Sequence, residues 1–532
     1  MTRGSKTIVA AVVGLLILAG APGVRAAPRW ERLSWTGPTD TTMTVTWTDD
    51  APGTGQVEYR RLGDPGSATL PADGTPTGSG DLDITYTATL TGLEPSAEYE
   101  YRVESGGSWG GWFPFRTAPA PGSCEPVRFA ALGDNRGQEL LGFYIASLQW
   151  DDVAIAVAGE APLFTLDTGD FIYDGSNTEQ WPPEMDHTTP LSRVSPFFLE
   201  FGNHDDGPGE GPGANFNMVF NYPHDGPDGV DDYYHFITGN VLVVGLSTYT
   251  YSMDVQIDWL RTLLEAHVAD VDWRVVFFHT PVWSSGAHGS NEDDKPRAAR
   301  LVPLLDEFGV DLVLNGHDHD YERFHPSRGG YGGIPRVWTP LPLDGGTRGV
   351  AEGTTYIVTG GAGALANPIF TATLPGNARG SNHLNFVLAD VEGGTMRLTA
   401  RDCGQQLTSW TTADCSGTLE SIVFEKDSIV CSGPDADADA DADADGDAEI
   451  DAEPDAVEDD GVTPPDVVPD TPEEVAPDVR EETADDAPGE TKPPSPNGSS
   501  GCGCRAAPGA AAPSMLLLLA AFPALGLRRR RG

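Results

Sequence analysis

Five strand-like runs in the middle of the chain each end on a side chain that can bind a metal ion. The side chains at these ends are Asp134, Asp170, Asn203 with His204 and Asp205, His279, and His317 with Asp318 and His319. In an open α/β sheet, ligands bind just past the carboxyl ends of the strands. One carboxylate after one strand is typical of an ordinary turn, but five such endings in one segment do not arise readily by chance. The sequence therefore predicts an α/β domain with a polar, metal-binding site at one edge of its sheet.

The chain is long enough for several domains, and its charge is unevenly distributed. Its 532 residues exceed the 100–200 or so that one domain usually holds. Of the net charge of −48, residues 434–492 carry −22, which leaves −26 elsewhere. Such an acidic chain repels nucleic-acid phosphates, so no nucleic-acid binding is expected. An anionic substrate would have to be attracted locally, by metal charge.

Residues 1–26 are predicted to be a secretory signal peptide. A basic start precedes an apolar or small run from Thr7 to Ala21, and Val24–Ala26 offers a cleavage site. A transmembrane anchor is the alternative, although the run is short for one. Export permits disulfides. Four cysteines are candidates, and pairing Cys403 with Cys415 and Cys124 with Cys431 is one of three arrangements that the sequence leaves open.

The C-terminal segments differ from the rest of the chain. Residues 434–500 repeat Asp-Ala and then become rich in Glu, Pro and Thr, which predicts an extended, disordered stalk. Calcium binding is the alternative, although glycine-punctuated loops are missing. Residues 501–532 hold a Gly-Cys-Gly-Cys motif, an apolar run and four arginines, an arrangement that resembles the myxobacterial C-terminal sorting signal. That resemblance implies export with cell-surface anchoring, or secretion after C-terminal processing; a permanent single-span anchor is the alternative.

Residues 28–120 are predicted to be an all-β domain. Three runs alternate at period two, with Gly, Pro and Asp between them: Thr42–Trp47, Gln56–Arg60 and Tyr86–Leu90. The stretch Gly92–Val103 resembles the turn and tyrosine corner of a fibronectin type III sandwich, with Trp47 as its core tryptophan. We expect a packing module without chemistry, joined by a linker at residues 118–122.

Residues 125–430 alternate strands with helical stretches. Helical spacing of apolar residues occurs in Leu140–Trp150, Val255–Val268 and Ala298–Phe308. Later strands are predicted at Thr355–Thr359, His383–Leu388 and Met396–Ala400. The pattern predicts a mixed α/β domain with sheets packed between helices.

The ordered set of strand-end side chains resembles the calcineurin-like metallophosphoesterases. Gly169–Tyr173 and Gly316–Arg323 are similar to the purple acid phosphatase branch in particular. The resemblance covers roughly residues 28–425. It implies a four-layer α/β/β/α sandwich preceded by the fibronectin type III-like domain.

A pair of metal ions about 3.5–4 Å apart can clamp both the attacking and leaving oxygens of a displacement. Such a pair needs a shared carboxylate, for which we choose Asp170. His317 and His319 are two residues apart and, in extended chain, would face one way with roughly 6–7 Å between them. By resemblance, one metal takes Asp134, Asp170, Tyr173 and His319, and the other takes Asp170, Asn203, His279 and His317.

Tyr173 determines the expected kind of metal. A phenolate is a hard anionic ligand that suits Fe(III), while imidazole and amide oxygen suit a divalent Zn, Fe or Mn. A packed aromatic ring beside the site is the alternative for Tyr173.

Arg136 departs from the family pattern, which usually has His or Gly there. Arginine stays protonated and cannot bind a metal, so Arg136 either pairs with substrate phosphate or forms a structural salt bridge. His204 and His288 resemble the family's histidines that contact phosphate or protonate the leaving group. Asp205 is expected to orient His204.

These resemblances imply an exported phosphatase that hydrolyses phosphomonoesters by attack of a metal-bound hydroxide. Its partner would be a small phosphorylated substrate. A phosphodiesterase or nucleotide-cleaving enzyme of the same fold is one alternative. A non-catalytic surface interaction protein is an alternative of another class.

Overall fold

The structure, a computed structural model, describes residues 28–431 with gaps at 51–52, 77–81, 83, 141–142, 206–213, 227–228, 230–231, 250–251, 290–299, 331–336, 340–346, 350–352, 367–373 and 406–411. The predicted signal peptide, acidic stalk and C-terminal tail lie outside the described residues. Among the described residues, no helix has the length and apolar character needed to cross a membrane.

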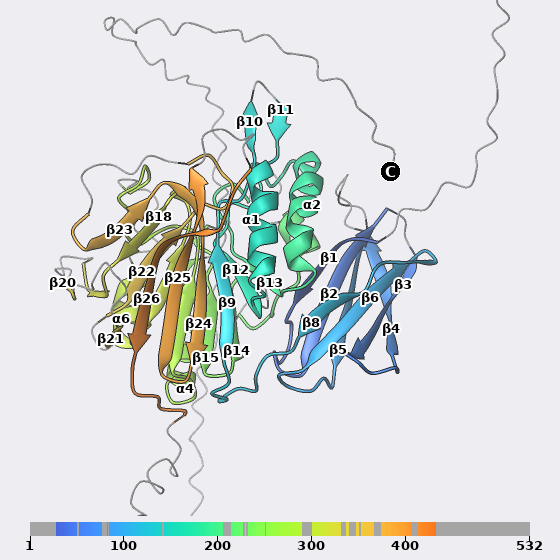
Figure 1. Ribbon diagram of the computed structural model, residues 1–532, viewed down its shortest axis with the longest axis horizontal. Helices are drawn as coiled ribbons and strands as arrows, with labels where there is room; N and C mark the ends of the chain where they lie inside the picture. The colour runs from blue at the N-terminus through green and yellow to red at the C-terminus, as the bar shows by residue number, and fades with distance from the viewer. Residues whose placement is uncertain are drawn as a thin grey trace, which may run out of the picture. The chain divides into compact units, whose positions relative to one another are not determined.

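The first part of the chain is an antiparallel β-sandwich (Figure 1). Its strands are β1 (Arg29–Ser34), β2 (Thr42–Asp49), β3 (Thr54–Arg61), β4 (Ala68–Pro76), β5 (Ile84–Thr91), β6 (Glu98–Ser105), β7 (Ser108–Trp109) and β8 (Phe113–Arg116). Strand β4 pairs first with β3 and then, from Gly74 onward, with β5, so it passes between the two sheets.

The sandwich core is aromatic. Trp47 is fully buried and stacks on Tyr86, with ring centroids 5.4 Å apart. Gly74 lies against the same ring, where an added Cβ would come within 2.5 Å of Tyr86. The Tyr99 hydroxyl accepts a hydrogen bond from the backbone N–H of Glu94 at 2.9 Å, which is the contact of a tyrosine corner. The all-β prediction is confirmed, while the fibronectin type III likeness stays a prediction.

The second part of the chain contains two seven-stranded sheets. In order, the first holds β13 (Phe197–Leu199), β12 (Phe164–Asp167), β9 (Val127–Leu132), β24 (His383–Glu392), β25 (Thr395–Gln405), β26 (Gly417–Glu425) and β21 (Thr347–Gly349). The second holds β14 (Tyr234–Thr238), β15 (Val241–Gly245), β16 (Trp273–Phe277), β17 (Leu312–Asn315), β22 (Thr355–Thr359), β18 (Tyr321–Phe324) and β23 (Asn377–Ser381). Strands β9, β12 and β13 are parallel, as are β15, β16, β17 and β22. A small pair, β19 (Ser327–Arg328) and β20 (Val337–Trp338), lies apart from both sheets.

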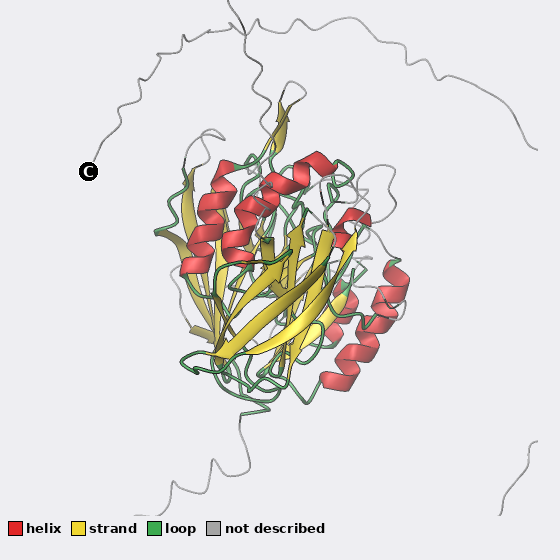
Figure 2. Cartoon of the chain, turned by 90° about the vertical axis from the view of Figure 1, so that its right-hand side faces the viewer, coloured by secondary structure: helices red, strands yellow, loops and turns green. Residues whose placement is uncertain are grey.

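The helices lie on the outside of the strand layers (Figure 2). They are α1 (Leu148–Gly159), α2 (Trp181–Ser192), α3 (Ala214–Val219), α4 (Met253–His267) and α6 (Val302–Glu307), with a 3-10 turn at Thr178–Gln180. Strand β15 shows the layering, because its successive side chains point to opposite faces. Val243 joins the core cluster that includes Phe129 of the other sheet, whereas Val244 joins the cluster that includes Leu260 of α4. The predicted α/β/β/α sandwich is confirmed.

One helix prediction is wrong at its start. The stretch Leu140–Trp150 begins as the hairpin of β10 (Gln138–Leu140) and β11 (Phe143–Ile145), and α1 starts only at Leu148. The hairpin projects from the domain (Figure 1), and the side chains of Leu140 and Phe143 are 50% and 73% exposed. The helical spacing of these apolar residues therefore did not indicate the buried face of a helix. Helix α4 and strands β22, β24 and β25 lie where predicted, and α6 lies within the third predicted helix, of which residues 298–299 are outside the described part.

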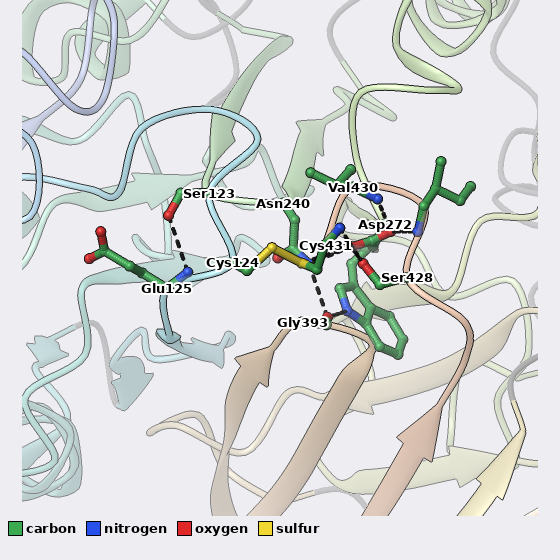
Figure 3. Close-up of a disulfide and its surroundings, with 11 residues drawn as sticks. Ser123, Cys124, Glu125, Asn240, Asp272, Gly393, Ser428, Val430 and Cys431 are labelled. Atoms are coloured by element: carbon green, nitrogen blue, oxygen red, sulfur yellow. Dashed lines mark hydrogen bonds between the residues drawn. A yellow bond between two sulfur atoms is a disulfide. The ribbon is translucent and has the colours of Figure 1, made fainter. Parts of the chain in front are cut away.

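Two disulfides resolve the pairing that the sequence left open. Cys124 bonds Cys431 across 307 residues, and Cys403 bonds Cys415 across 12. Figure 3 shows that Asp272 lies beside the first disulfide, where its carboxylate accepts hydrogen bonds from the backbone of Val430 and from the Ser428 hydroxyl. The first disulfide thereby bonds the segment just after the predicted linker to Cys431.

Candidate active site

The five polar strand ends lie after adjacent parallel strands. Strands β9, β12 and β13 are neighbours in one sheet, and β16 and β17 are neighbours in the other. Asp134 follows β9, Asp170 follows β12 and His279 follows β16. Ligand atoms of these three buried side chains lie within 4.8 Å of one another, and they form the one such group of His, Cys, Asp and Glu in the described part of the chain.

The backbone turns sharply where these side chains begin. Asp134, Asp170 and His317 adopt left-handed φ angles of 55°, 58° and 70°. This conformation costs roughly 1–3 kcal/mol per non-glycine residue and tends to be kept at functional sites. Gly169 has φ 106°, and an added Cβ would lie 2.6 Å from the backbone nitrogen of Gly202. Only glycine allows the loops after β12 and β13 to approach so closely.

The Nε2 atom of His279 lies at the centre of one predicted ligand group. It is 3.3 Å from Asp170 Oδ1, 3.2 Å from Asn203 Oδ1 and 3.2 Å from His317 Nδ1. The structure therefore brings together all four side chains expected for the second metal, including Asn203, which follows β13.

The other predicted group is arranged around Asp134. His319 Nε2 lies 3.5 Å from Asp134 Oδ1, and the backbone N–H of His317 donates to Asp134 Oδ2 at 2.8 Å. Asp134 Oδ1 is buried and has no hydrogen-bond partner among the described residues. Because an orphaned carboxylate oxygen is costly in the interior, a bound cation is the natural partner for it.

Backbone carbonyls orient the two histidine rings. His279 Nδ1 lies 3.0 Å from the carbonyl oxygen of Thr168, and His319 Nδ1 lies 2.7 Å from that of Leu365. When Nδ1 donates to such an oxygen, Nε2 is left with its lone pair toward the carboxylates, as in metal-binding histidines. Neither Thr168 nor Leu365 could be predicted from the sequence, because the contribution of each is a backbone atom.

The electrostatics of the cluster suit cations. Burial, reinforced by the charge of Asp170, raises the pKa of Asp134 well above its usual value. Burial also acts to raise the pKa of Asp170, but the neighbouring His279, His204 and Arg136 more than offset it and lower that pKa. Burial lowers the pKa of His279, and that of His319 to about 4, so both imidazoles are neutral at pH 7. Crowded carboxylates and neutral imidazoles form a donor set that fits metal ions.

The matches to known protein families divide the chain into the same two parts as the structure does. Residues 28–117 match the model described as "Purple acid Phosphatase, N-terminal domain", and residues 128–321 match "Calcineurin-like phosphoesterase". These two parts of the chain are thus similar to a purple acid phosphatase N-terminal domain followed by a calcineurin-like phosphoesterase domain.

Individual proteins are similar to about half of this chain. An uncharacterized protein of Mycobacterium tuberculosis is 33% identical over 310 residues, covering 52% of this chain and 57% of that protein. "Purple acid phosphatase 18" of Arabidopsis thaliana is 30% identical over 308 residues, covering 53% of this chain and 64% of that protein. The chain thus spans less than two thirds of the length of either relative.

A solved purple acid phosphatase from yellow lupin (Lupinus luteus) seeds has the same fold. It superimposes with a TM-score of 0.64 at 20% identity, covering 76% of this chain and 75% of that one.

In the phosphoesterase domain, Arg136 lies directly on the predicted bridging carboxylate. Its Nε is 3.2 Å from Asp170 Oδ2, and only 11% of its side chain is exposed. The structure shows the salt-bridge option, and substrate binding by Arg136 stays a prediction. The guanidinium also lies over the Tyr173 ring, 5.2 Å from its centroid. Tyr173 is half-buried at the edge of the cluster, so its role as a ligand also stays a prediction.

His204 lies at the same edge. Its backbone N–H donates to Asp170 Oδ1 at 3.1 Å, and its Nε2 is 3.9 Å from Asp170 Oδ2. Its Nδ1 lies 2.6 Å from the carbonyl oxygen of Tyr173, which fixes the ring.

The expected role of Asp205 needs correction. Its carboxylate accepts the backbone N–H groups of Asp170, Ile172 and Gly202 at 2.8–2.9 Å, and Tyr173 orients the His204 ring instead. Asp205 thus holds the loop that carries Asp170. Its side chain turns toward those N–H groups because burial leaves them no water to bind.

His288 lies beside His317. Its ring centroid is 4.1 Å from that of His317, and 38% of its side chain is exposed. Asp318 Oδ1 accepts from both its backbone N–H, at 2.8 Å, and its Nδ1, at 3.1 Å. Asp318 was expected only as one of the residues at a strand end. Its position between the predicted ligands His317 and His319 is the sequence signal that could have identified its importance.

Proposed function

We propose that the phosphoesterase domain is a metal-dependent phosphatase that hydrolyses phosphomonoesters. The observation that carries the proposal is the buried cluster of Asp134, Asp170 and His279 at the carboxyl ends of parallel strands from both sheets, within a domain that matches calcineurin-like phosphoesterases.

Two metal ions fit this site. One would be held by Asp134, Asp170, Tyr173 and His319, and the other by Asp170, Asn203, His279 and His317. When bound, such ions polarise phosphoryl oxygens and lower the pKa of a water molecule. We propose Fe(III) on the Tyr173 side, because phenolate is a hard ligand, and a divalent Zn, Fe or Mn on the other.

The remaining side chains would bind and orient the substrate. His204 lies near Asp170 and His288 lies beside His317. Each ring has its Nδ1 held by a hydrogen-bond acceptor, which leaves Nε2 for a phosphoryl or leaving-group oxygen. A proton on Nε2 of either ring would stabilise charge on that oxygen. Arg136 pairs with Asp170 and would add positive charge beside a dianionic ester.

The test measures metal content and turnover on the purified chain. Wild type should contain two metals per chain and hydrolyse 4-nitrophenyl phosphate much faster than bis(4-nitrophenyl) phosphate. Asp170→Asn removes a buried charge while keeping the size of the side chain, and it should lose both metals and activity. A faster rate on the diester would favour a phosphodiesterase. Absence of bound metal in wild type would favour a non-catalytic interaction protein.

We also propose export and attachment to a bacterial cell surface. The support is the composition of residues 1–26 and 501–532 together with two disulfides, which persist in oxidising compartments. Fractionation of producing cells, with and without residues 1–26, tests this. The fibronectin type III-like character of residues 28–120 is likewise proposed, from the Tyr99 corner.

A further inference from the structure

A buried polar network connects the loop after β16 to the start of β18. The hydroxyl of Ser284 contacts the carboxylate of Asp318 and lies 2.7 Å from Glu322 Oε1. The backbone N–H of Gly286 donates to the same hydroxyl at 2.9 Å. Ser284, Asp318 and Glu322 are each at most 2% exposed, so water does not compete for these groups.

Glu322 attaches this loop to the second sheet. It lies on β18 and accepts the backbone N–H of Ser285 at 2.7 and 3.0 Å through its two oxygens. Asn377 of β23 also binds its carboxylate. Because β18 and β23 are paired strands, the loop is held by a rigid element.

Asp318 connects Ser284 of this loop to His288. One carboxylate oxygen accepts from His288 twice, through the backbone N–H and through Nδ1, while the other contacts Ser284. An added Cβ on Gly286 would come within 2.6 Å of Asp318, so the loop packs directly against this carboxylate. His288 is thereby fixed beside His317.

The single proton of the Ser284 hydroxyl limits which hydrogen bonds this network can form. A serine hydroxyl has one proton and can donate to only one of the two carboxyl groups. The contact with the other is a hydrogen bond only if that group is protonated. Burial raises the pKa of Glu322 above its ordinary value. Ser284 thus lies between Glu322 and Asp318, and Asp318 in turn contacts Nδ1 of His288.

We infer that Ser284 and Glu322 are positioning residues that hold His288 toward substrate, acting through Asp318. The inference rests on the proposed function, because it gives His288 a phosphorylated ligand. The competing explanation is that the network stabilises the loop and has no effect on the ligand.

A double-mutant cycle on the metal-loaded full chain separates these explanations. Ser284→Ala should lower kcat/KM for 4-nitrophenyl phosphate about tenfold, and His288→Ala about a hundredfold. If Ser284 acts through His288, the double variant should be no worse than His288→Ala alone. Losses that multiply, or a normal kcat/KM in Ser284→Ala, would overturn the inference.

Ser285→Ala is the matched control. Its hydroxyl lies in the same loop but accepts from the backbone N–H of Leu374, at 3.0 Å, and from Asn377, at 3.1 Å. It should lower the melting temperature while leaving kcat/KM unchanged. Glu322→Gln keeps the size and shape of the side chain and its ability to hydrogen-bond Ser284, and should retain activity that Glu322→Ala loses; equal losses in both would count against the inference. Metal content and melting temperature, measured on every variant, show which of them fold.

The dissociation constant for inorganic phosphate is also measured by calorimetry for every variant of this double-mutant cycle. If wild type binds phosphate but does not turn over ester, the proposed function fails while the positioning cycle still gives an answer. If wild type neither binds phosphate nor hydrolyses ester, both proposals are overturned.

Discussion

Glu184 is a buried carboxyl group whose titration should be visible in the stability of the catalytic domain. It lies in the first turn of α2 and is fully buried. Its Oε1 accepts the backbone N–H of Gly137 at 2.9 Å and contacts the Tyr144 hydroxyl. Burial, only partly offset by these hydrogen bonds, raises its pKa from 4.5 to about 8.

The sign and size of the effect follow from this shift. Between pH 4.5 and 8 the native state keeps the Glu184 proton while the unfolded state loses it. The free energy of unfolding therefore falls by about 1.4 kcal/mol per pH unit as pH rises through this window, or about 5 kcal/mol in total. Below the window both states are protonated, and above it the loss is complete.

Glu184→Gln removes the titration but keeps an acceptor oxygen for Gly137. Urea unfolding followed by tryptophan fluorescence, at one-unit steps from pH 5 to 9, gives the free energy of unfolding for each protein. We expect the variant to gain stability over wild type steadily as pH rises to 8. Glu179→Gln, at an exposed position just before α2, is the control and should run parallel to wild type. A Glu184→Gln curve that also runs parallel to wild type would refute the reasoning.

Three further predictions concern the metal, the disulfides and the tail. Tyr173→Phe should abolish the visible charge-transfer band of the iron-loaded protein while the circular dichroism stays unchanged; a colourless wild type, or a variant with the same band, would exclude Tyr173 as a ligand. Replacing Cys124 and Cys431 together by Ser should lower the free energy of unfolding by about 6 kcal/mol, against about 3 kcal/mol for Cys403 with Cys415, because the closed loops span 307 and 12 residues. Equal losses in urea unfolding would count against this loop-entropy reasoning. A chain ending at Cys431 should keep the kcat of the full chain, since residues 434–500 have no core-forming composition; a large drop in kcat would show that the tail contributes to the site.

Much of the site was predictable because its signals are local. An apolar run followed by Asp134 or His279 marks the carboxyl end of a buried strand, and parallel strands present these ends at one edge. The structure places both side chains in one cluster. Period-two alternation likewise predicted the β-sandwich around Trp47.

Other features have no local signal. The hairpin at Leu140 has helical apolar spacing, and only its exposure shows that the spacing marks no core. Asp205 was expected to contact the ring of its neighbour, but buried N–H groups of another loop compete for its carboxylate. Ser284 and Glu322 are 38 residues apart and became recognisable only through their hydrogen bond.

The sequence by itself determined which residues follow the strands that form the site, and therefore what chemistry this site can hold, because these depend on neighbours along the chain. Tertiary structure decided the partner of Cys124, the left-handed turns at Asp134 and Asp170, and the network behind His288. These depend on which distant segments the two facing sheets bring within hydrogen-bonding distance. Burial then makes each such contact obligatory, since a polar group without water must find its partner within the fold.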